Sequence, residues 1–116
     1  MYHSHDCHPH EHTRSLHTHR ERTPLPVGVT TGGTVVLDLA HNKNFRVSVD
    51  SSVNTFTLSL SRGRDGRMGH IVVDANHDVS VAWAATGLTA IAPVPTQQSS
   101  PTCYRYYVTS THAFIQ

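Results

Sequence analysis

The sequence has little charge of either sign and no long hydrophobic stretch. Nine Lys and Arg residues stand against eight Asp and Glu residues, which gives a formal net charge of +1, and Lys43 is the only lysine. This balance argues against a nucleic-acid or anionic-membrane partner, because both recognise concentrated positive charge. No apolar run approaches the roughly 20 residues that a membrane-spanning helix needs. We therefore expect a soluble protein with no nucleic-acid and no membrane partner.

Cysteine and glutamate are also scarce. The two cysteines are Cys7 and Cys103, and sequence alone does not decide between a disulfide and two thiols. Residues 27–116 contain no glutamate, so a catalytic carboxylate pair would have to consist of aspartates. No nucleophile elbow, phosphate-binding loop, dinucleotide fingerprint or CxxC motif occurs. The sequence therefore predicts a protein that is not an enzyme.

Histidine, in contrast, is in excess, and it divides the chain of 116 residues. Seven of the eleven histidines lie in the first twenty residues. Residues 1–22 contain one aliphatic side chain, Leu16, among Leu, Ile and Val, which is too little to form a core. Pro24 and Pro26 then favour an extended backbone. We predict a His-rich N-terminal anchoring arm with a proline linker over residues 1–26 and one domain over residues 27–116.

The arm carries three HxH units. In an extended chain, residues two apart point to the same side, so each unit presents two imidazoles together. Imidazole nitrogen is a ligand for Zn, Fe and Ni, and a thiolate can join it. The predicted ligands of such a transition metal are His3, His5, His8, His10, His12, His17, His19 and Cys7.

Two interpretations of the arm without a structural metal stay open. It can be a polar segment that packs on neighbouring subunits, with histidine as hydrogen-bond donor and stacking surface. It can also be a purification tag, although Asp6, Cys7 and Glu11 interrupt it and tags avoid such residues.

The remainder of the chain alternates between apolar and small polar side chains. Period-two segments span residues 34–40, 44–50, 54–61, 69–74, 77–83, 104–109 and 112–115. Their spacing predicts an all-β domain, an antiparallel, jelly-roll-like β-sandwich of about 7–8 strands. The same alternation directs Phe45, Phe56 and Trp83 into its core.

A glycine-rich loop over residues 61–69 holds three arginines, Arg62, Arg64 and Arg67. Guanidinium groups suit carboxylates and phosphates, and Asp65 together with the single lysine argues against nucleic acid. We expect these arginines to contact another protein subunit. The three glycines of the loop are expected to occupy positions with positive φ.

The order of the segments resembles a β-domain of tailed-bacteriophage virion proteins, which occurs in tail fibres and in small head or tail attachment and decoration proteins. The matching pieces are Leu37-Asp38-Leu39, Phe45-Arg46-Val47-Ser48-Val49, Leu58-Ser59-Leu60-Ser61, Gly66 to Gly69, Ile71-Val72-Val73 and Val79-Ser80-Val81-Ala82-Trp83. The sequence departs from the family at Ala84, where proline usually follows the tryptophan, and at Phe114-Ile115, in place of an aromatic pair.

This resemblance implies a non-enzymatic virion structural protein, assembled in the host cytoplasm. It would be a homotrimeric capsid-decoration, head-fibre or tail-fibre module, bound to other virion proteins of the capsid or tail through its arm. Two other functions stay open. One is metal buffering or sensing by the arm. The other is a receptor module for a host-surface glycan, with Trp83 as an exposed platform.

Overall fold

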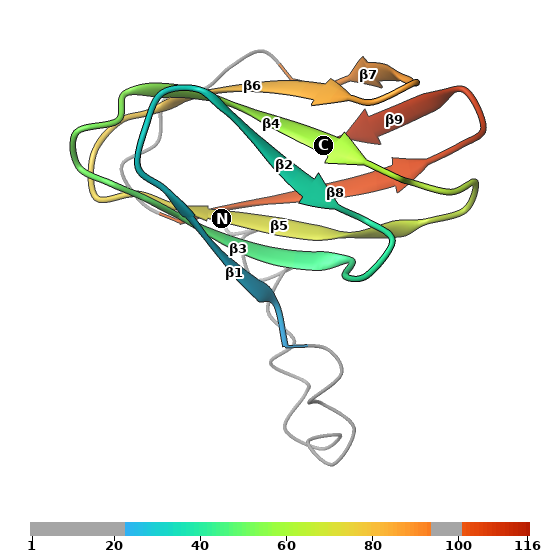
Figure 1. Ribbon diagram of the computed structural model, residues 1–116, viewed down its shortest axis with the longest axis horizontal. Coiled ribbons are helices and arrows are strands. Elements are labelled where there is room, and N and C mark those ends of the chain that lie inside the picture. Colours follow the sequence, from blue (N-terminus) through green and yellow to red (C-terminus); the bar gives the residue numbers. More distant parts are fainter. Residues whose placement is uncertain (1–22, 94–100) are drawn as a thin grey trace.

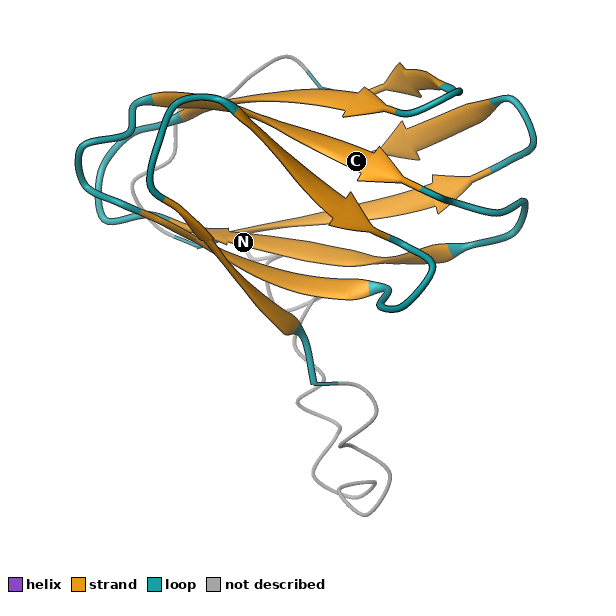
Figure 2. Cartoon of the chain, in the orientation of Figure 1, coloured by secondary structure: helices purple, strands orange, loops and turns teal. Residues whose placement is uncertain are grey.

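The computed structural model describes residues 23–93 and 101–116, and every regular element within them is a strand (Figure 2). These residues form nine strands: β1 (Leu25–Val29), β2 (Thr34–Asp38), β3 (Asn44–Val49), β4 (Thr55–Ser61), β5 (Met68–Asp74), β6 (Ser80–Ala85), β7 (Thr89–Ile91), β8 (Thr102–Val108) and β9 (His112–Ile115). None of the described residues belongs to a helix that could cross a membrane. Leu25 and Pro26, which lie within the predicted arm and linker over residues 1–26, begin β1.

The strands form two facing sheets (Figure 1). The six-stranded sheet has the order β1-β3-β5-β8-β9-β7, and the three-stranded sheet has the order β2-β4-β6. From β1 to β6 the chain changes sheet at every step, so strands two apart in sequence pair in parallel. The chain therefore winds as a β-solenoid of about four turns.

The predicted antiparallel, jelly-roll-like sandwich is wrong. The described residues are all-β, but parallel pairing joins β1 to β3 to β5 and β2 to β4 to β6. Parallel sheets are usually covered on both faces and therefore lack a period-two pattern. In a solenoid, each parallel sheet has one face on the core and one face in solvent, so its strands alternate as antiparallel strands do. Alternation therefore located strands without fixing their direction.

Equivalent side chains of successive turns stack on one another. Leu25, Phe45 and Ile71 are aligned across β1, β3 and β5, at intervals of 20 and 26 residues. A repeat in this range is typical of solenoids, and it is the sequence signal for parallel winding. Because the intervals are unequal, loops of different length obscure this repeat in the sequence.

The core lies between the sheets and is almost entirely aliphatic and aromatic. Phe45, Val47 and Leu58 are completely buried, and the inward residues of β8 and β9 close the core with Tyr104, Tyr106, Val108, Ala113 and Ile115. The closure differs from the earlier turns, because β8 runs antiparallel to β5 and β9 antiparallel to β8. Figure 1 shows β9 and β7 curving toward β6, so the six-stranded sheet wraps around one side of the core.

Strand β1 forms an outer edge of the six-stranded sheet. The amide of Asp50 donates to the carbonyl of Val29 at 2.8 Å, so the peptide groups of Val29 and of residues two apart from it face β3. The peptide groups of Pro26 and Gly28 therefore point away from β3, toward the open edge of the sheet. A proline at this position costs no ladder hydrogen bond and leaves the edge one donor fewer for unwanted pairing.

A buried tyrosine fastens the β2–β3 loop to the six-stranded sheet. The Tyr106 hydroxyl donates to the carbonyl oxygen of Lys43 at 2.6 Å, beside Gly69 of β5. Burial raises the pKa of the Tyr106 phenol far above its usual value, and the charge of nearby Arg67 opposes this rise. The phenol is therefore held in its neutral, donating form.

Because the Tyr106 phenol is buried in its neutral form, we expect the protein to lose stability in alkali. A folded-state pKa above that of the unfolded chain gives stability that is present below about pH 10 and lost as pH rises further. We expect the urea midpoint of the wild type to be lower at about pH 11 than at about pH 9. The midpoint of Tyr106→Phe is expected to fall less over the same change of pH. Equal falls in the two proteins would show that another group is responsible.

Candidate binding groove on the six-stranded sheet

Four exposed apolar side chains form one row across the outer face of the six-stranded sheet. Met68 of β5 is in register with Tyr107 of β8. Tyr107 is in register with Phe114 of β9, which is aligned with Ile91 of β7. All four are exposed, Met68 to 57%. With strands about 4.8 Å apart, this apolar row (Met68, Tyr107, Phe114, Ile91) extends for roughly 14 Å.

A second row, polar in character, runs beside the first. It consists of Asn44, His70, Arg105 and Gln116. The last three each lie two residues along the chain from a member of the apolar row, and Asn44 is in register with His70. The amide of Arg105 donates to the carbonyl of Gln116 at 3.0 Å, and the amide of Gln116 donates back at 2.8 Å. Strand register thus sets an apolar row parallel to this polar row (Asn44, His70, Arg105, Gln116).

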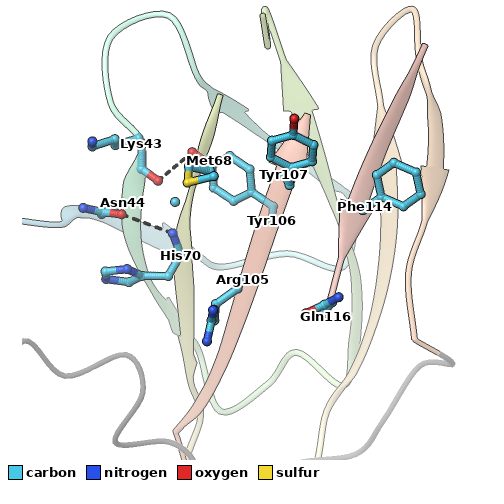
Figure 3. Close-up of a pocket in the computed structure, with 10 residues that line it drawn as sticks. Lys43, Asn44, Met68, His70, Arg105, Tyr106, Tyr107, Phe114 and Gln116 are labelled. Atoms are coloured by element: carbon cyan, nitrogen blue, oxygen red, sulfur yellow. Dashed lines mark hydrogen bonds between the residues drawn. The ribbon is translucent and has the colours of Figure 1, made fainter. Parts of the chain in front are cut away.

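The two rows line a groove of about 430 Å³. Its wall consists of both rows except Ile91, together with Lys43, Gly69 and Tyr106. Figure 3 shows Met68, Tyr107 and Phe114 toward one side of the groove and His70, Arg105 and Gln116 toward the other. The volume lies within the range typical of small-ligand sites.

Internal contacts fix the wall of the groove. The His70 amide donates to Oδ1 of Asn44 at 3.1 Å, while Tyr106 holds the Lys43 carbonyl. The ring of Phe114 is stacked on the ring of His112, with centroids 5.6 Å apart and planes at 19°. Oγ1 of Thr111 lies 2.6 Å from Nδ1 of His112, which restrains that ring in turn. The groove is therefore a formed surface on paired strands, suited to binding without rearrangement.

The three arginines of the loop between β4 and β5 have different environments. Nε and Nη2 of Arg62 both donate to the Asp38 carboxylate, and the Nε–Oδ1 distance is 3.0 Å. This hydrogen bonding lowers the pKa of Asp38, an effect that the amide of Ala40 reinforces, and raises the pKa of Arg62. Arg64 is exposed, whereas Nε of Arg67 is buried without a hydrogen-bond acceptor among the described residues. Arg62 thus binds within its own chain, and the predicted contact with another subunit stays a prediction.

The glycines of this loop correct one expectation. Only Gly66 has a positive φ, at 89°, and the other left-handed position is taken by Arg62, at 59°. Gly69 is required for a different reason, because the Lys43 carbonyl approaches its Cα closely.

The residues predicted for the core lie on inward faces. Phe45 and Phe56 are buried, and Trp83 is half-buried against the core. Trp83 is in register with Leu58 but stands on β6, an edge of the three-stranded sheet. Its ring meets that of Tyr104 edge to face, with centroids 4.9 Å apart. It therefore packs between the sheets rather than forming an open platform.

The predicted metal ligands of the arm, His3 to His19 and Cys7, lie outside the described residues. Within residues 23–93 and 101–116, no group of three or more His, Cys, Asp or Glu side chains is placed to hold a metal ion. Cys103, on the outer face of β8, is half-buried and is not a free thiol.

No family model, curated protein or solved structure matches this chain. The resemblance to phage virion proteins therefore stays a prediction, and the groove is the feature of the described residues that bears on function. Sequence reasoning missed that groove. The signal was large apolar side chains on both faces of one strand, as in Tyr104 to Val108 and His112 to Ile115. Recognising it also required the register of four strands, which no local pattern supplies.

Proposed function

We propose that this protein is a non-enzymatic binding module that recognises saccharides through the groove on its six-stranded sheet. The observation that carries the proposal is the pairing of an apolar row with a polar row, in register across the strands. Sugar rings have apolar faces and polar edges, so one side of such a ligand stacks on Tyr107 and Phe114 while its hydroxyls reach Asn44 and Gln116.

The row length supports an extended ligand. The part of the apolar row that lines the groove, from Met68 to Phe114, extends for roughly 10 Å. This exceeds the width of one ring, so a short oligosaccharide fits better than a monosaccharide. The virion location, the homotrimer and attachment through the arm remain proposals based on the sequence resemblance. In that setting, the groove would face a host-surface glycan while the arm binds other virion proteins.

The test is binding of oligosaccharides to the full chain. A panel of neutral and acidic oligosaccharides is screened, and the best ligand is measured by isothermal titration calorimetry. Tyr107→Ala is expected to weaken binding at least about tenfold, which corresponds to about 1.4 kcal/mol. Tyr107→Phe keeps the ring and is expected to bind nearly as the wild type does.

The control is Val36→Ala, because Val36 is also apolar and is 60% exposed, but lies on the other sheet. It should bind normally. Absence of binding to every saccharide would overturn the proposal. So would light scattering that shows an oligomer which Tyr107→Ala converts to a monomer, because the groove would then be an interface between copies.

A further inference from the structure

The charged side chains around the groove have one sign. Lys43 and Arg105 line it, and none of the described residues in its wall has a carboxylate side chain. Both cationic side chains are exposed. A guanidinium at this position favours an anionic ligand over a cationic one.

Arg105 differs from two other arginines of the domain. Arg46, on the same outer face, pairs with Asp74 at 2.6 Å, and Arg62 pairs with Asp38. Among the described residues, no carboxylate lies within ion-pair distance of Arg105. Arg46 is engaged by Asp74, so among the described residues Arg105 is the guanidinium on this face without an ion-pair partner.

The position of Arg105 relates it directly to the apolar row. Arg105 and Tyr107 are two residues apart on β8 and both point outward, so their Cα atoms are about 6.6 Å apart. A ring stacked on Tyr107 therefore places a substituent at its edge within reach of the Arg105 side chain. The reciprocal hydrogen bonds between the backbones of Arg105 and Gln116 hold this part of β8 in place.

We propose that the groove binds an acidic oligosaccharide, whose carboxylate or sulfate group is held by the guanidinium of Arg105 while a sugar ring lies on Tyr107 and Phe114. This inference rests on the proposed function and specifies its ligand class. A guanidinium binds a carboxylate or sulfate through two parallel N–H···O hydrogen bonds, which gives direction as well as charge.

The experiment compares ligands that differ only in charge. Calorimetry of the full chain uses an oligogalacturonate and its methyl ester, and then a sulfated oligosaccharide and its desulfated form. The acidic member of at least one pair is expected to bind at least about tenfold more tightly. This advantage should shrink as salt concentration rises.

Variants at two arginines separate a specific contact from net charge. Arg105→Gln is expected to remove the preference for the acidic member, so that the two members of a pair bind with similar affinity. Arg105→Lys keeps the charge but not the paired hydrogen bonds, and should be intermediate. Arg64→Gln removes the same charge from an exposed loop residue and should bind as the wild type does.

The outcomes distinguish this inference from the proposed function. Equal binding of both members of each pair, unaffected by Arg105→Gln, would overturn the inference and leave saccharide binding intact. No binding of any member would overturn both. Acetate or sulfate that competes at the same concentration as the acidic oligosaccharide would show a simple anion site, and would overturn the inference as well.

Discussion

Replacement of Phe45 by alanine is expected to lower the free energy of unfolding by about 3–5 kcal/mol. Phe45 is completely buried and stands on β3, between β1 and β5, so its ring contacts inward residues of neighbouring turns. Its removal costs the transfer of the ring to water and leaves a cavity that three paired strands cannot close. This loss is a large share of the ~5–15 kcal/mol that stabilises a typical domain.

Urea unfolding followed by circular dichroism measures the effect. Val36→Ala is the control, since its side chain is mostly exposed on the outer face of β2; a change within about 0.5 kcal/mol is expected. Trp83→Ala should cost less than Phe45→Ala, because Trp83 is only half-buried. A loss below about 1 kcal/mol for Phe45→Ala would contradict the position of this ring at the centre of the core.

Gly69→Ala is expected to destabilise the protein by about 2–4 kcal/mol, from overpacking and the loss of one buried hydrogen bond. A Cβ at this position would overlap the Lys43 carbonyl oxygen and lie 2.9 Å from its carbon and 2.8 Å from the Tyr106 hydroxyl. Two of these groups are backbone atoms, so side-chain rotation cannot relieve the overlap. The β2–β3 loop must move away, and Tyr106 then loses its acceptor.

Gly28→Ala provides the matched control. Nothing lies within 4 Å of a Cβ built at Gly28, which is also a strand residue with ordinary φ. This change should stabilise the protein by about 0.4–1 kcal/mol, because it restricts the unfolded chain. Thermal unfolding of the two variants compares them directly. Similar melting temperatures would show that the close approach at Gly69 does not exist in solution.

Local sequence pattern located seven of the strands because each alternates over four or more residues. Alternation also identified the inward residues of β3 and β4, such as Val47 and Leu58, which are completely buried. It missed β1, where Pro24 and Pro26 were interpreted as a linker, and β7, which has three residues and no period to detect. Proline is compatible with β1 only because that strand is an edge, and edges are a property of the assembled sheet.

The sequence by itself determined that this chain is built of strands and which side chains enter the core, because both depend on alternation between adjacent residues. Only the tertiary structure decided strand direction and register, since a residue such as Phe45 points inward equally well in a parallel or an antiparallel sheet. Strand register brings Met68, Tyr107 and Phe114 into one row from positions up to 46 residues apart. It also sets Arg105 two positions from Tyr107 on that face, which is why the candidate site appears only in the folded protein.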